Sequence, residues 1–70
     1  MPRFAVQVVI FETEFDPERQ MAAEITAATA GAAETEAITY FEDGGDGPLA
    51  GLTRGTDYTA VATPFGARPA

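Results

Sequence analysis

Residues 3–15 carry apolar side chains on both sides of the β-strand that they are expected to form. Successive side chains of a strand point to opposite faces. One face would hold Phe4, Val6, Val8 and Ile10, and the other would hold Ala5, Gln7, Val9 and Phe11. A strand with one face in water alternates apolar with polar residues instead. The segment therefore predicts a central strand whose two faces are both covered.

A helix is expected from residue 17 to residue 30. Asp16 suits the N-cap, Pro17 suits the first helical position and Gly31 suits the position just after the helix. Glu18 lies in the first turn, where the helix dipole favours a negative charge. The buried stripe of this helix would comprise Met21, Ile25 and Ala28, which recur at helical spacing.

Two further strands are predicted at residues 34–42 and 57–63, with Pro64 ending the second. The sequence thus predicts an α+β domain of order β-α-β-β, in which one helix covers one face of a three-stranded sheet. The first strand lies in the middle, and a right-handed crossover joins a parallel or split pair of strands. A long loop at residues 43–56 and an irregular tail at residues 64–70 complete the chain.

The length of 70 residues predicts a single domain, residues 1–70, with a marginal core. Small domains are often stabilised by disulfides or metal ions. This chain contains neither Cys nor His, so a disulfide or a zinc site is excluded. Oligomerisation, or insertion into a larger assembly, is the remaining way to stabilise such a domain.

The residue types that most enzymes use are absent, since the chain contains no Cys, His, Lys, Ser, Asn or Trp. Serine and cysteine nucleophiles, imidazole bases and Schiff-base lysines are therefore excluded. Paired carboxylates remain, such as Glu12 with Glu14 and Glu34 with Glu36, but solvated strand edges account for them. We expect a protein that is not an enzyme and that binds no cofactor.

The net charge of −7 argues against direct binding to nucleic acid or to an anionic membrane, because both need a basic face. No segment is long and apolar enough to span a bilayer. Glu12 and Glu14 follow the first apolar run where a signal peptide would have small residues, so a cytoplasmic location is expected. The exclusive use of Arg in place of Lys indicates a high-GC genome.

Two local motifs have alternative interpretations. Asp43 and Asp46, with Glu42 nearby, provide oxygen ligands for a hard cation, but turn chemistry explains Asp and Gly at these positions equally well. Residues 52–59 resemble the stretch that enters the F strand of fibronectin type III domains. That resemblance implies that the Tyr58 hydroxyl reaches back to the loop backbone. The expected helix and the missing Trp argue against that fold for the whole chain.

These observations predict a non-enzymatic structural or interaction protein that acts in a homo-oligomer or a larger assembly. A small head or tail component of a phage virion from a high-GC host is one such role. The alternative is an acidic inhibitor that binds the basic surface of a nucleic-acid-processing enzyme. Binding to other chains is expected through the first strand, the loop and the tail. The predicted interface residues are Val9, Phe11, Leu49, Leu52, Phe65 and Arg68.

Overall fold

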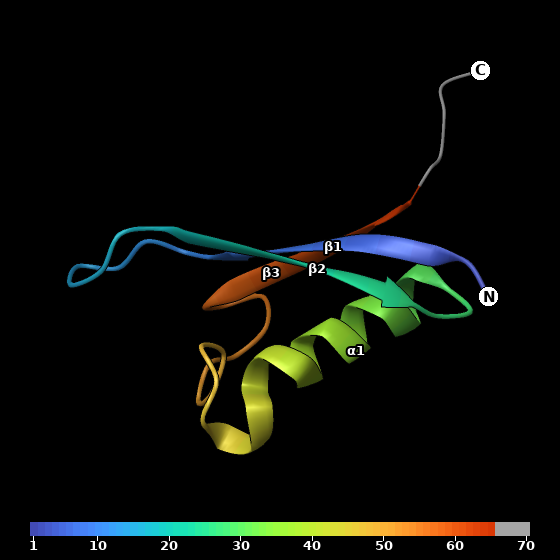
Figure 1. Ribbon diagram of the computed structural model, residues 1–70. Coiled ribbons are helices and arrows are strands. Elements are labelled where there is room, and N and C mark those ends of the chain that lie inside the picture. The colour runs from blue at the N-terminus through green and yellow to red at the C-terminus, as the bar shows by residue number, and fades with distance from the viewer. Residues whose placement is uncertain (66–70) are drawn as a thin grey trace.

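The structure is a computed structural model, and it describes residues 1–65. Three strands and one helix follow each other in the order β-β-α-β. They are β1 (Arg3–Ile10), β2 (Arg19–Thr26), α1 (Ala30–Glu42) and β3 (Tyr58–Pro64). The strands form one sheet, and α1 lies across one of its faces (Figure 1). The predicted α+β class, with one helix on a three-stranded sheet, is confirmed, whereas the order β-α-β-β is wrong.

The sheet has the strand order β2-β1-β3, and β1 pairs antiparallel with both neighbours. The prediction that the first strand lies in the middle is therefore confirmed. Because β2 and β3 both run opposite to β1, they run parallel to each other with β1 between them. The unit β2-α1-β3 is thus a split β-α-β arrangement. The sequence predicts the helix after the first strand, whereas in the structure it follows the second strand.

Strand β2 occupies most of the segment predicted to be helical. Met21 and Ile25 are four residues apart, a spacing that suits one face of a helix and one face of a strand equally well. Ala23 lies between them and completes a row of half-buried residues at every second position. Asp16 does not cap a helix, because its carbonyl accepts a hydrogen bond from the Thr13 N–H (2.9 Å) in a hairpin loop. The local pattern thus fits both a helix and a strand, and hydrogen bonding to β1 stabilises the strand.

Helix α1 occupies the segment predicted as the second strand. Thr29 is its N-cap, and the Thr29 hydroxyl accepts a hydrogen bond from the Ala32 N–H (3.1 Å). Thr35 and Thr39 are β-branched and therefore favour a strand, but both fit the helix because their hydroxyls bond helix carbonyls. Thr35 donates to the Gly31 carbonyl (3.1 Å) and Thr39 donates to the Thr35 carbonyl (3.0 Å). Gly31 is therefore inside the helix rather than beyond its C-terminus.

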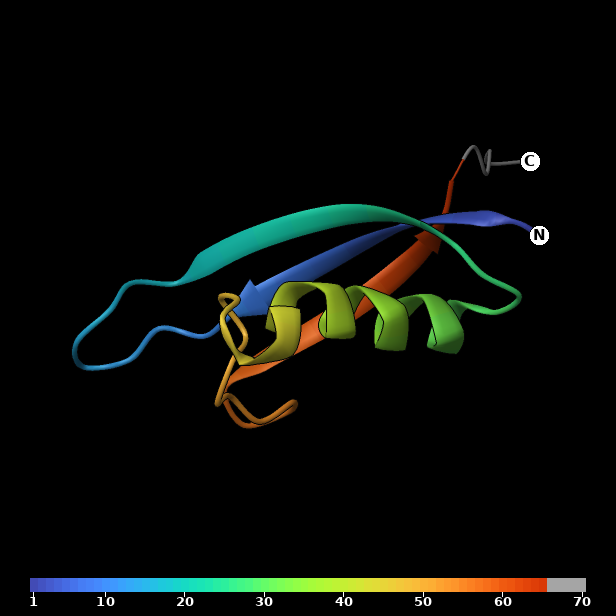
Figure 2. The same cartoon turned by 60° about the horizontal axis from the view of Figure 1, so that its bottom comes forward.

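Figure 2 shows α1 in front of one face of the sheet, and the core residues come from both elements. The helix-facing row of β1 is buried, as are two small residues one turn apart on α1, Ala33 and Ala37. Their short side chains let the helix approach the sheet closely. The buried residues are Phe4, Val6, Val8, Ile10, Ala27, Ala33, Ala37, Leu49, Tyr58 and Ala60.

The segment between α1 and β3 is a loop, as predicted, and it begins with a short 3₁₀ turn at Asp43–Gly45. It folds back over the end of α1, where the Gly47 N–H donates to the Glu42 carbonyl (2.9 Å). A Cβ atom on Gly47 would lie 1.9 Å from the Phe41 carbonyl oxygen, so only glycine fits there. This close approach brings Leu49 into the core, where its side chain is fully buried.

Among the residues that the structure describes, no helix combines the length and the apolar character needed to cross a bilayer. Strand β3 begins and ends one residue later than predicted, and Pro64 is its last residue rather than the residue after it. The predicted tail beyond residue 65 lies outside the described residues.

The burial of Leu49 generates a stability prediction. We expect Leu49→Ala to lower the free energy of unfolding by about 2–5 kcal/mol, because a fully buried leucine leaves a cavity when it is truncated. Leu52→Ala is the matched control, since Leu52 is only half-buried against the same core, and it should have a smaller effect. Urea unfolding followed by circular dichroism measures both. Equal effects would contradict a core role for Leu49.

Candidate protein-binding surfaces

The face of the sheet opposite α1, here called the open face, is not covered by any described residue. Strand alternation and the pairing register place four residues of β1, four of β2 and three of β3 on it. They are Arg3, Ala5, Gln7, Val9, Gln20, Ala22, Glu24, Thr26, Thr59, Val61 and Thr63. The sequence predicts that both faces of β1 are covered, and in this chain only one of them is.

Polar contacts fix several side chains of the open face. The Gln7 side-chain amide donates to the Gln20 side-chain oxygen (3.0 Å) across β1 and β2. Arg3 forms an ion pair with Glu24 (2.7 Å), and its guanidinium lies over the Phe65 ring, 4.8 Å from the ring centre. Both members of the ion pair are about half exposed, so the pair orients side chains more than it stabilises the fold.

Large apolar side chains also lie on the open face or continue it. Val61, at the centre of β3, is 56% exposed, and Phe65 is 49% exposed. Phe11 follows β1 in the same alternation and is 38% exposed, with its N–H bonded to the Asp57 carbonyl (2.9 Å). Val9 is half-buried between these positions. The structure thus brings Val9, Phe11 and Phe65, three of the predicted interface residues, to one surface.

The other predicted interface residues lie elsewhere. The Leu49 side chain is fully buried under the loop, so it is a core residue and is unavailable to a partner. Leu52 is half-buried and packs against the same core. The Gly-rich sequence of the loop gives no sign that it folds back onto α1, so the burial of Leu49 could not be derived from it. Arg68 lies outside the described residues.

The sequence does not predict the hairpin loop between β1 and β2, because it indicates a helix directly after the first strand. It projects from one end of the molecule (Figures 1 and 2). The Thr13 hydroxyl accepts hydrogen bonds from the N–H groups of Phe15 (3.1 Å) and Asp16 (3.0 Å), which orders the turn. The Phe15 side chain is 87% exposed. The neighbouring acidic residues of this loop are Glu12, Glu14, Asp16 and Glu18.

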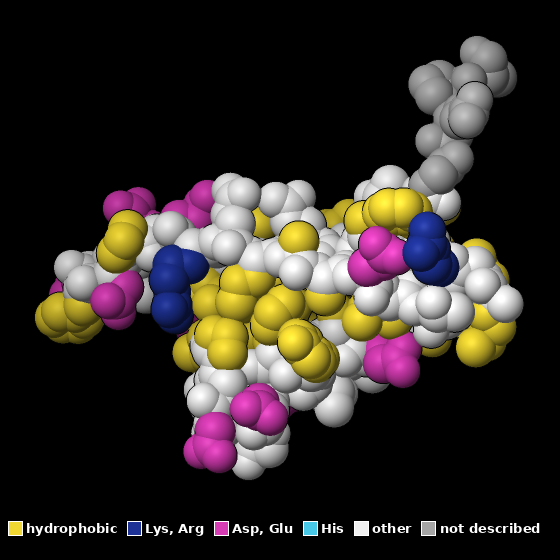
Figure 3. All heavy atoms as spheres, in the orientation of Figure 1, with side chains coloured by type: hydrophobic (Ala, Val, Ile, Leu, Met, Phe, Trp, Pro, Cys, Tyr) yellow, Lys and Arg dark blue, Asp and Glu magenta, His cyan; other side chains and the backbone are white. Residues whose placement is uncertain are grey.

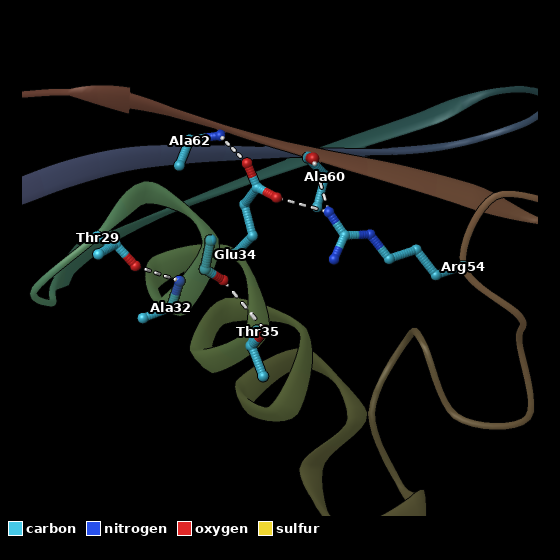
Figure 4. Close-up of polar contacts among 8 residues, drawn as sticks. Thr29, Ala32, Glu34, Thr35, Arg54, Ala60 and Ala62 are labelled. Atoms are coloured by element: carbon cyan, nitrogen blue, oxygen red, sulfur yellow. Dashed lines mark hydrogen bonds and ion pairs between the residues drawn. The ribbon is translucent and has the colours of Figure 1, made fainter.

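A polar cluster joins α1, the loop and β3 (Figure 4). Arg54 donates to one carboxylate oxygen of Glu34 (2.6 Å) and to the Ala60 carbonyl (3.4 Å). The other Glu34 oxygen accepts from the Ala62 N–H (3.2 Å). The Arg54 hydrogen bond, followed by the Ala62 hydrogen bond, lowers the pKa of Glu34 below its usual value of 4.5. The sequence predicts that Glu34 lies at a solvated strand edge, whereas the structure shows that it links α1 to the loop and to β3.

The two local motifs have structural roles. Asp43 has positive φ (46°) at the end of α1, and its carbonyl accepts from the Asp46 N–H (3.1 Å), as the turn interpretation requires. Within residues 1–65, no three acidic side chains are grouped closely enough to hold a metal ion. The loop is attached to β3 through the Tyr58 backbone carbonyl, which accepts from the Gly55 N–H (2.7 Å). Within residues 1–65, the Tyr58 hydroxyl donates no hydrogen bond to the loop backbone, so the predicted hydroxyl contact is wrong.

Comparison of the chain with protein-family models, with curated proteins and with solved structures finds no match.

The lowered pKa of Glu34 predicts a pH-dependent contribution to stability. A carboxylate with a depressed pKa stabilises the fold above its unfolded-state pKa, and the contribution is lost as the pH falls through the folded-state pKa. We expect Glu34→Gln to be less stable than the wild type at neutral pH, with the difference shrinking below the usual pKa of 4.5. Thermal unfolding of both proteins across this range measures it. A difference that is constant with pH would contradict the role of the charge.

Proposed function

We propose that the chain is a non-enzymatic assembly component that binds other protein chains through the open face of its sheet. The observation that carries the proposal is the uncovered face with its exposed Phe11, Val61 and Phe65 side chains. Exposed apolar side chains on one face of a small protein mark interaction sites, and here polar residues such as Gln7 and Thr63 lie between them. A sheet normally buries such a face against a second layer, and residues 1–65 supply only α1, on the other side.

The chemistry of the hollows supports a binding role rather than catalysis. A hollow of about 550 Å³ lies beside α1, and Glu36 is the single ionisable side chain among its lining residues. A hollow of about 380 Å³ at the end of α1 has two ionisable side chains among its lining residues, Asp43 and Tyr40. Catalytic sites bring together several convergent polar groups with defined mutual geometry. The assembly we favour is a particle such as a phage head or tail, in keeping with the high-GC composition.

The hairpin loop favours a second candidate, an acidic inhibitor. Four acidic residues surround the exposed Phe15 on a projecting loop, which suits insertion into a basic groove of an enzyme that processes nucleic acid. The two functions respond oppositely to salt. Added salt screens the repulsion between chains of charge −7 and strengthens self-association, whereas it weakens binding of the acidic loop to a basic partner.

The proposal predicts that one charge on the open face disrupts association. We expect the wild-type protein to sediment as an oligomer at micromolar concentration and Val61→Glu to raise the dissociation constant of that contact roughly tenfold or more, because an unpaired charge is costly to bury. The stability of the isolated domain should change by less than about 1 kcal/mol, since Val61 is already exposed. Sedimentation velocity at low and high salt measures the association.

Phe11→Glu is expected to act in the same direction as Val61→Glu. Thr56→Glu, in the exposed loop before β3, is the matched control, because it adds the same charge outside the strands of the sheet. If Val61→Glu and Thr56→Glu sediment identically to the wild type, the open face does not bind other copies of the chain.

A further inference from the structure

The two outer edges of the sheet differ in how their backbone groups are used. In an antiparallel pair, residues that exchange hydrogen bonds alternate with residues whose backbone groups point away. The Phe11 N–H bonds the Asp57 carbonyl (2.9 Å) and the Phe65 N–H bonds the Arg3 carbonyl (2.8 Å). Odd-numbered residues therefore link β1 to β3. The backbone groups of Tyr58, Ala60, Ala62 and Pro64 consequently point to the outer edge of β3.

The chain itself blocks the outer edge of β3 (Figure 4). The Tyr58 carbonyl accepts from the Gly55 N–H (2.7 Å), and the Ala60 carbonyl accepts from Arg54 (3.4 Å). The Ala62 N–H donates to Glu34 (3.2 Å). Pro64 has no N–H to offer at the next outward position. Protection of this kind prevents an edge strand from pairing with another chain.

The outer edge of β2 has no such protection. The Ala27 N–H bonds the Pro2 carbonyl (3.1 Å), so even-numbered residues of β1 bond the odd-numbered residues of β2. The outward backbone groups belong to Gln20, Ala22, Glu24 and Thr26. Within residues 1–65, no hydrogen bond reaches these groups. Strand β2 is eight residues long and contains neither proline nor glycine, so a long regular edge is left unpaired.

The helix-facing side of β2 is also incompletely covered. On β1 and β3 the helix-facing residues are mostly buried, whereas on β2 they are only half-buried: Met21, Ala23 and Ile25. Figure 3 shows hydrophobic side chains gathered between the sheet and the helix on this side. A groove of about 340 Å³ lies there between the β2 edge and Tyr40, which is 69% exposed. A strand added to β2 would cover this groove.

We propose that a second copy of the chain pairs its β2 antiparallel with this β2 and extends the sheet from three strands to six. The inference shares with the proposed function the premise that the chain is an assembly component. It concerns a different surface, the outer edge of β2, and does not depend on binding through the open face. The register that fits best is centred on Ala23, which lies opposite the same residue of the second copy. Met21 of each copy then lies opposite Ile25 of the other, so apolar residues meet apolar residues.

This register avoids electrostatic conflict. Glu24 lies opposite an alanine of the second copy, and it stays paired with Arg3 in its own chain. A register centred on Glu24 would place two carboxylates face to face, which is unfavourable. Antiparallel pairing also directs the two acidic hairpin loops to opposite ends of the sheet. Both helices lie on the same face, so the Tyr40 side chains border the gap between them. The edge is therefore complementary to itself.

Cysteine crosslinking tests the pairing directly, because the chain contains no cysteine of its own. In the proposed register, residue 23 faces its counterpart at a non-hydrogen-bonded position, where the two Cα atoms are roughly 4.5 Å apart. This separation permits a disulfide. We expect Ala23→Cys to form a disulfide-linked dimer under mild oxidation as its main product.

Two further cysteine variants control the crosslinking experiment. Ala22→Cys should crosslink poorly, because residue 22 faces residue 24 in this register. Thr56→Cys, in an exposed loop, reports random collision. Crosslinking of Ala23→Cys no faster than that of Thr56→Cys would overturn the proposal, and preferential crosslinking of Ala22→Cys would overturn the register.

Ala22→Pro tests the edge without a new thiol. The residue 22 N–H points outward and is unused within the fold, so its removal should weaken the β2–β2 contact roughly tenfold or more while α1 remains folded. Circular dichroism checks the helix, and sedimentation velocity measures the mass. Loss of association in Ala22→Pro but not in Val61→Glu supports the edge and rejects the open face. The reverse result, with Ala22→Pro sedimenting like the wild type, overturns the edge pairing and retains the proposed function.

Discussion

Strand β1 forms hydrogen bonds along both of its edges, and the remaining structure depends on this central position. Pairing with β2 and β3 gives β1 two sheet neighbours and presents two apolar faces. Helix α1 covers one of these faces, and the loop adds Leu49 to the same layer because Gly47 permits a close approach to the end of the helix. The layer is thin, since the helix contributes mainly alanines to it. Burial is therefore concentrated on one side, and the other side keeps Val61 and Phe65 in solvent.

The sequence predicts the fold class, the central strand and the last strand because each depends on a strong local pattern. The apolar residues of β1 require burial of at least one face of the strand, and Pro64 marks the end of β3. The assignments of helix and strand between them are exchanged because the local pattern is ambiguous. Met21 and Ile25 suit both periods, and alanine suits a helix well while fitting a half-buried strand without penalty. In α1, Thr35 and Thr39 resemble strand residues until their hydroxyls are seen to bond carbonyls four residues earlier.

Part of the open face could be predicted from strand alternation. Val9 and Phe11 alternate with the buried row of β1, so their place opposite the helix could be derived from residue numbers alone. The protection of the β3 edge could not be derived from the sequence, because it depends on contacts between residues far apart in the chain. Glu34 lies 28 residues before Ala62, and Arg54 lies 20 residues after Glu34. Such contacts exist only once the helix is in place, and the sequence predicts a strand at Glu34.

The arrangement of charges explains how a chain with a net charge of −7 is compatible with association. Strand β2 carries one Arg and one Glu, and Glu24 is neutralised by Arg3, so the edge and its neighbourhood have little net charge. Much of the excess negative charge lies at the hairpin loop and near the end of α1, away from the centres of the open face and of the β2 edge. Repulsion between copies is therefore weakest where β2 meets β2 in antiparallel orientation, and it is strongest for a parallel arrangement that would bring two acidic loops together. The charges thus restrict the orientation in which two copies can approach.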